Sequence, residues 1–231
     1  MSTAFDAHAE SYHAALDQGL SVSGESAHFF ARGRIAWLAA RLRERGIVSP
    51  AVLDYGCGTG TAVPFFFELL GARSVLGIDE SARCLEIARG VHGDVRARFV
   101  EARLYVPEGS IDLVHCNGVM HHVAPAARAS LTRHIADCLA PNGVFALWEN
   151  NPWSPAARYV MSRIPFDRGV SMVWPRTAQQ LMRQAGLHAS APEYCFIFPR
   201  GLRALRFMEG RVSRLPLGAQ YLVLGSKPGP A

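Results

Sequence analysis

Short apolar runs alternate with amphipathic segments through the middle of the chain. Apolar residues cluster in runs typical of buried strands, and between the runs they recur at helical spacing. The predicted strands are 51–55, 74–78, 97–101, 111–116 and 144–149, and the predicted helices between them are 60–70, 81–89 and 126–139. Such alternation predicts a parallel sheet with helices packed against it, which is an α/β fold.

The pattern changes at both ends of this alternation. Residues 2–18 and 28–45 show helical spacing, whereas residues 150–173 show none and are predicted to be irregular. Beyond them we expect a helix at 177–185, strands at 194–198 and 220–225, and a basic helix at 200–210. We therefore expect a single domain, 1–231, in three parts. These are N-terminal lid helices (1–48), a cofactor-binding core (49–150), and a substrate-side insertion with edge strands (151–231).

Composition narrows the class of protein. The chain has 231 residues, 49% of them apolar, and a net charge of +5 in which Lys227 is the only lysine. No apolar run approaches the length needed to span a bilayer, and the N-terminus lacks the basic start and apolar core of a secretion signal. Five scattered cysteines without a Cys-x-x-Cys pair indicate free thiols. The expected location is the cytoplasm.

A glycine-rich turn follows the first predicted strand. Gly56, Gly58 and Gly60 form Gly-x-Gly-x-Gly, and Asp79 ends the next apolar run, where a carboxylate can hold a ribose diol. A dinucleotide fingerprint would space its third glycine one residue later. Asp54, just before the turn, would also repel a pyrophosphate and suits a cationic ligand. The turn therefore favours a nucleoside cofactor that carries positive charge.

Four segments in order resemble the motifs of class I S-adenosylmethionine-dependent methyltransferases. They are the acid and glycine turn at 54–60, Gly-Ile-Asp-Glu-Ser at 77–81, the run at 110–117, and Leu-Ala-Pro-Asn-Gly at 139–143. The nearest resemblance is to the group that includes the ubiquinone and menaquinone methyltransferases. It implies a Rossmann-like, seven-stranded mixed sheet of order 3-2-1-4-5-7-6, with helices on both faces and an N-terminal helical lid.

The resemblance also implies which residues bind S-adenosyl-L-methionine and its product, S-adenosyl-L-homocysteine. Asp79 would hold the ribose hydroxyls, Asn117 the ammonium group, and Tyr12 the carboxylate. The segment after the third strand departs from the family pattern, and either Glu101 or the backbone of Ala102 would read the adenine. The full expected set is Tyr12, Asp54, Gly56, Cys57, Gly58, Asp79, Glu80, Glu101, Ala102, Asn117 and His122.

Two adjacent histidines, His121 and His122, are the candidate catalytic residues because an imidazole can act as a base at neutral pH. A cofactor-side or structural role for His122 is the alternative. Together with His115 they fit no standard metal-ligand spacing, so we expect no metal site. The predicted substrate-binding residues are Glu149, Asn150, Trp153 and Arg158.

The expected function is methyl transfer to a small-molecule acceptor at O, N or C, such as a natural product or a lipid- or sugar-linked intermediate. Alternatives are a nucleic-acid or protein methyltransferase, a non-catalytic cofactor-binding partner subunit, and a nicotinamide-dependent oxidoreductase. No nucleic-acid partner is expected, because no recognised binding module is present. A basic run could contact a membrane surface or an anionic substrate, and its members are Arg200, Arg203, Arg206, Arg211 and Arg214.

Overall fold

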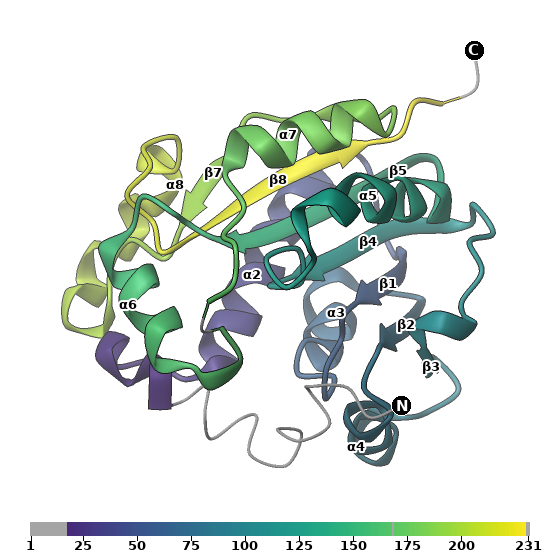
Figure 1. The fold of residues 1–231 in the computed structure, drawn as a ribbon, viewed down its shortest axis with the longest axis horizontal. Helices are drawn as coiled ribbons and strands as arrows, with labels where there is room; N and C mark the ends of the chain where they lie inside the picture. Colours follow the sequence, from purple (N-terminus) through teal and green to yellow (C-terminus); the bar gives the residue numbers. More distant parts are fainter. Residues whose placement is uncertain (1–17, 168, 230–231) are drawn as a thin grey trace.

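The computed structural model describes residues 18–167 and 169–229, so Tyr12 and nearly all of the predicted first helix lie outside the described residues. A mixed sheet runs through the molecule (Figure 1). Its strands are β1 (Ala51–Tyr55), β2 (Ser74–Asp79), β3 (Ala97–Glu101), β4 (Ile111–Asn117), β5 (Leu139–Asn150), β6 (His188–Ala189), β7 (Glu193–Cys195) and β8 (Gln220–Ser226). Their order is β3-β2-β1-β4-β5-β8-β6, and β7 also pairs with β8.

The sheet confirms the predicted topology with one difference. Strands β1 to β5 are parallel, and β8 runs antiparallel to β5. The strand predicted at 194–198 was wrong in extent. In the structure, two short strands, β6 and β7, pair with β8 in place of one longer strand. Pro192 lies between these two strands and has no N–H for the ladder, and Phe196 ends β7 with a left-handed φ of 61°.

Helices cover both faces of the sheet (Figure 1). They are α2 (Ala27–Arg43), α3 (Val63–Leu70), α4 (Ala82–His92), α5 (Arg128–Cys138), α6 (Pro155–Arg163), α7 (Pro175–Gln184) and α8 (Glu209–Val212). Apolar residues of α2, α3 and α4 pack into one buried cluster, and those of α5 and α7 into a second one. The sheet therefore lies between two hydrophobic layers, as the alternating pattern predicts.

Helix α6 contradicts the prediction that residues 150–173 are irregular. Ser154 caps it by accepting a hydrogen bond from the amide of Ala157, and Pro155 occupies the first turn. Only Ala157 and Met161 are buried along it, so the segment has almost no apolar periodicity to detect. A 3-10 turn, Pro165–Asp167, follows and places a carboxylate near the sheet.

Two further observations bear on the sequence-based expectations. None of the helices in the described part of the chain is long and apolar enough to cross a membrane. All five cysteines are free and buried.

Candidate active site

A cavity of about 1270 Å³ opens at the carboxyl ends of the parallel strands. Strands β1 to β4 end beside one another there, since Tyr55 pairs with Ile78, Asp79 with Glu101, and Tyr55 with Cys116 in the register of the sheet. Of the predicted site residues, those that line the cavity are Gly56, Gly58, Asp79, Glu80, Glu101, Ala102, Asn117, His121, His122 and Asn150. The sheet thus brings most of the predicted cofactor set into one space.

The glycine turn is held by Asp79. One carboxylate oxygen accepts from the amide of Gly58 at 2.8 Å, and the other accepts from the amide of Ser81 at 2.9 Å. Burial raises the pKa of Asp79, and the two amides only partly offset that effect. Each oxygen keeps a lone pair for a further donor, so the carboxylate can also accept from a diol. Gly58 has a φ of +53°, and a Cβ added there would meet no atom of the described residues within 4 Å.

Asp54 and Cys57 do not line the cavity. The Asp54 carboxylate is buried and lies 2.7 Å from Nδ1 of buried His115, so it supports the turn from beneath. Cys57 is buried too, and burial raises the pKa of its thiol well above the usual value. Both residues belong to the support of the glycine turn rather than to the surface that meets a ligand.

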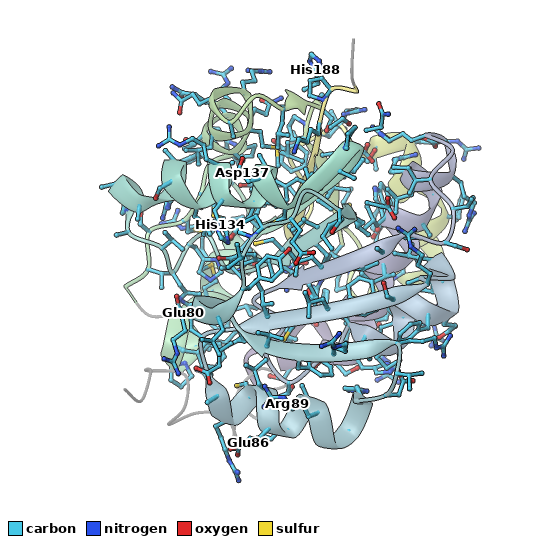
Figure 2. All side chains as sticks on the ribbon, turned by 90° about the vertical axis from the view of Figure 1, so that its right-hand side faces the viewer. Glu80, Glu86, Arg89, His134, Asp137 and His188 are labelled. Atoms are coloured by element: carbon cyan, nitrogen blue, oxygen red, sulfur yellow. The ribbon has the colours of Figure 1, made fainter. Side chains whose placement is uncertain are left out.

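Asn117 and Glu101 face the cavity from the ends of β4 and β3. The Asn117 Oδ1 atom is buried and has no hydrogen-bond partner among the described residues. A buried acceptor without a donor is costly, so this atom suits a ligand that brings an N–H group. Glu101 pairs with Arg103 at 2.7 Å, and that hydrogen bond lowers its pKa. Glu80 is exposed at the rim (Figure 2).

The two histidines meet a carboxylate that the sequence did not indicate. His122 Nε2 lies 3.3 Å and His121 Nε2 3.5 Å from Oδ1 of Asp167, in the turn after α6. On its other side, His121 Nδ1 lies 2.6 Å from Oε2 of Glu149. Asp167 was missed because nothing in a Pro-Phe-Asp segment marks it as a site residue before α6 is known to fold back onto the sheet.

His121 differs chemically from His122. Burial lowers the pKa of the His121 imidazole, but the carboxylates of Glu149 and Asp167 outweigh it and raise that pKa to about 10. The raised pKa favours the protonated form of His121, so of the two predicted catalytic histidines His122 is the better placed to act as a base. Asp167, in spite of burial, has its pKa lowered by the two histidines.

The predicted substrate residues are divided. Asn150 lines the cavity, where Gln220 donates to it at 3.2 Å and Arg34 donates to Gln220 at 3.0 Å. Glu149 does not line the cavity but contacts His121, which does. Trp153, 61% exposed, packs edge-on against Trp174, and Arg158 is exposed, so neither lines the cavity. The same segment contributes an apolar wall instead, made of Val160, Met161, Ile164 and Phe166.

Comparison with protein families resolves which cofactor this geometry serves. A family model described as a methyltransferase domain matches residues 27–190. The chain belongs to this methyltransferase family. S-adenosylmethionine is therefore its cofactor, as the glycine turn and the carboxylate of Asp79 predict.

Curated relatives of this methyltransferase are trans-aconitate 2-methyltransferases. Those of Enterobacter sp. (strain 638) and Escherichia coli O1:K1 are 25% and 27% identical over 138 and 140 residues. Each match covers 60% of this chain and 52% of the relative. The chain thus spans about half the length of the curated relatives it matches.

Solved structures show the same fold. A putative methyltransferase in complex with the Haloferax volcanii Trm112 activator has a TM-score of 0.64 at 19% identity, covering 99% of both chains. A S-adenosylmethionine-dependent methyltransferase from Mesorhizobium loti has a TM-score of 0.61 at 22% identity, covering 84% of this chain and 98% of that one. The confirmed architecture is the α/β methyltransferase fold.

The residues present fit the cofactor. The open face of Gly58 leaves room for close approach of a ligand to the backbone, and the Asn117 carbonyl oxygen lacks a donor that an ammonium group can supply. Asp79, Glu80 and Glu101 also give this end of the cavity an excess of carboxylates. Such an environment favours a cation over a phosphate-bearing dinucleotide.

Proposed function

We propose that this methyltransferase acts on a small-molecule acceptor that binds in the same cavity as the cofactor. The observation that carries the proposal is the continuity of the cavity from Asp79 and Asn117 to the apolar wall of α6 and the polar group formed by His122 and Asp167. Its volume of about 1270 Å³ exceeds the roughly 300–1,000 Å³ usual for a site that holds one small ligand. Two ligands side by side would use that space.

The chain's own contribution to the reaction is positioning and exclusion of water. The bond from the methyl carbon to sulfur breaks with its electron pair left on sulfur, while the acceptor's lone pair forms the new bond, so the cofactor supplies the leaving group. Val160, Ile164 and Phe166 would hold the acceptor in a dry pocket beside the cofactor. An acceptor that arrives protonated also needs a group to take its proton, and His122 remains the candidate because the carboxylates around His121 favour its charged form.

The relatives suggest an acid as the acceptor. The curated relatives are named for methylation of trans-aconitate, a small carboxylic acid. In this chain, Arg34 lines the cavity on the side of α2, next to Gln220 and Asn150. An anionic group of the acceptor would pair with Arg34 there.

Two alternatives are less well supported. A non-catalytic partner subunit would tolerate an altered glycine turn, whereas Gly58 and Asp79 here form a complete turn. A macromolecular substrate would need a surface for it, and two arginines of the predicted basic stripe make contacts within the chain instead. Arg206 pairs with Glu25 at 2.8 Å, and Arg214 donates to the carbonyl of Ala191 at 3.0 Å.

A surface role for residues 200–214 stays a proposal. Most of the segment is a 3-10 helix, Arg200–Met208, which is kinked at Leu202. Arg203 and Arg211 are exposed beside the exposed apolar residues Leu205 and Phe207. Contact of this segment with a membrane surface or an anionic substrate, the cytoplasmic location and the three-part division of the domain all remain predictions.

The experiment that tests the proposal has two stages. Calorimetric titration with S-adenosylmethionine and S-adenosylhomocysteine, with NAD as control, should show binding of the first two alone. A methyl-transfer assay on a panel of small carboxylic acids, phenols and amines should then find an acceptor. Arg34→Gln should lower the turnover of anionic acceptors and leave the turnover of other acceptors unchanged. Cofactor binding without turnover of any panel member, together with methylation of RNA or protein, would contradict the small-molecule assignment.

A further inference from the structure

A group of three possible ligands lies at the acceptor end of the cavity. The side chains of His121, His122 and Asp167 each present one ligand atom, and these atoms all lie within 4.8 Å of one another. The histidines follow β4, whereas Asp167 comes from the turn after α6, so the fold brings the group together across 45 residues of sequence. All three residues line the cavity.

The two distances from Asp167 to the histidines are compatible with ligands around one ion. Oδ1 of Asp167 lies 3.3 Å from Nε2 of His122 and 3.5 Å from Nε2 of His121. Charge-assisted hydrogen bonds are shorter, at about 2.7–2.9 Å. Ligand atoms about 2.0–2.2 Å from a shared metal, at tetrahedral to octahedral angles, lie roughly 3.0–3.5 Å apart. The spacing at Asp167 is therefore long for a charge-assisted hydrogen bond and compatible with shared coordination.

His121 is also held as metal-bound histidines are held. Its Nδ1 lies 2.6 Å from Glu149, which is itself buried, and this contact fixes the orientation of the ring. Its Nε2 is buried, and within the described part of the chain it makes no hydrogen bond, although Oδ1 of Asp167 lies 3.5 Å away. A carboxylate on one nitrogen and a second nitrogen without a hydrogen bond form the outer-shell arrangement typical of histidine ligands. The unpartnered Nε2 is thus a second observation that indicates a bound ion.

We propose that His121, His122 and Asp167 bind one divalent first-row transition metal ion at the acceptor end of the cavity. Two imidazoles and one carboxylate are the donor set preferred by zinc, iron and neighbouring ions, and three protein ligands leave positions open for a substrate. The sequence predicted no metal site, because the three histidines considered as ligands, His115, His121 and His122, have unsuitable spacing. Asp167 completes the set, and His115 belongs elsewhere, against Asp54.

A role for the ion follows if the proposed function holds. An acceptor oxygen bound at an open position would lose its proton to water more readily, because the positive charge stabilises the anion. His122 would then serve as a ligand rather than as the base, so the two roles of His122 are alternatives. The metal site itself does not depend on the identity of the acceptor.

The test is calorimetric titration of chelator-stripped protein with Zn²⁺. Wild type should bind one ion per chain, and Asp167→Asn should bind it at least about 100-fold more weakly, because an amide is a far poorer ligand than a carboxylate. Glu149→Gln should lose roughly 10- to 100-fold, the usual effect of an outer-shell partner. His188→Gln, which changes an exposed histidine on β6 (Figure 2), should bind as wild type does.

Two further measurements keep the result decisive. If Asp167→Asn fails to fold by circular dichroism, His122→Gln replaces it, since the His122 side chain is 20% exposed and tolerates change better. Titration with Co²⁺ should give no thiolate charge-transfer band, because the proposed site contains no cysteine. Absent binding, binding unchanged in folded Asp167→Asn or His122→Gln, or a thiolate band would each overturn the proposal.

Cofactor binding separates this inference from the proposed function. Folded Asp167→Asn should still bind S-adenosylhomocysteine, because Asp167 is not among the residues assigned to the cofactor. If wild type binds the cofactor but not Zn²⁺, only the proposed metal site is contradicted. Cofactor binding that fails in wild type removes the proposed function and leaves the Zn²⁺ result to stand alone.

Discussion

Oε2 of Glu149 lies 2.6 Å from Nδ1 of His121, and both side chains are almost fully buried. The same carboxylate accepts a hydrogen bond from the backbone amide of His121 at 3.3 Å. Glu149 thereby holds the loop after β4 against the end of β5. Because the positive imidazole lies between Glu149 and Asp167, it is balanced by charge on both sides.

Replacing Glu149 with Gln should destabilise the fold in a pH-dependent way. The pKa of His121 is raised from 6.5 to about 10, so its ion pairs contribute fully below pH 6.5 and lose their contribution as the pH rises through about 10. Breaking a buried pair costs about 3–5 kcal/mol, and Asp167 remains as a partner, so we expect roughly 3 kcal/mol at pH 7.

Urea unfolding in the presence of a chelator measures this loss. The difference between wild type and Glu149→Gln should shrink between pH 7 and pH 10. Glu86→Gln is the control, because Glu86 is an exposed residue of α4 paired with Arg83 (Figure 2), and it should change stability by no more than about 0.5 kcal/mol. An equal loss at both pH values would show that the Glu149 effect is packing and not charge.

Gly58→Ala and Gly71→Ala should separate backbone strain from ligand contact. Both glycines have positive φ, +53° and +60°, and neither has an atom closer than 3.9 Å to an added Cβ. Each substitution should therefore cost about 1–2 kcal/mol of stability through the left-handed backbone alone. Of these two glycines, Gly58 lines the cavity and Gly71 does not. Therefore Gly58→Ala alone should weaken the binding of S-adenosylhomocysteine in calorimetry. Equal affinity in the two variants would place the cofactor elsewhere.

Asp79→Ala should weaken cofactor binding by about 1–3 kcal/mol, or roughly 5- to 150-fold in Kd, because it removes a charged hydrogen-bond acceptor. The loss includes the amide contacts that hold Gly58 and Ser81 in place. Glu80→Gln is the neighbouring comparison, and its exposed position at the rim predicts a smaller change. Calorimetry with S-adenosylhomocysteine measures both, and an unchanged affinity in Asp79→Ala would contradict its assignment to the ribose.

The parts of the fold and site that the sequence predicted depend on short-range patterns. Strand β1 and the glycine turn at Gly56 to Gly60 lie within ten residues, and Asp79 ends the next strand at a regular spacing. Parallel strands then bring their ends to one edge without further information. The cofactor side was therefore predictable before any contact was known.

The acceptor side was not predictable, because its contacts join distant segments. His121 meets Glu149 across 28 residues, and Arg34 meets Gln220 across 186. Asp167 reaches the histidines only because α6 forms, and that helix buries too few residues to show a period. Trp153 and Arg158 lie on this helix or just before it, and the side that faces the cavity is made of Val160 and Met161 instead.

His122→Gln should reduce methyl transfer about 100-fold or more once an acceptor is found, whether His122 takes a proton or holds an ion. The chelator distinguishes the two roles. If His122 is the base, chelation leaves wild-type turnover unchanged, and the rate of wild type falls at acid pH as the imidazole gains a proton. If His122 is a ligand, chelation lowers wild type to the level of the variant, and added Zn²⁺ restores wild type but not the variant. His188→Gln should match wild type throughout, since that exposed residue of β6 lies outside the cavity lining. Near-normal turnover of His122→Gln under both conditions would make the residue structural, and the acceptor's proton would then have to leave to water.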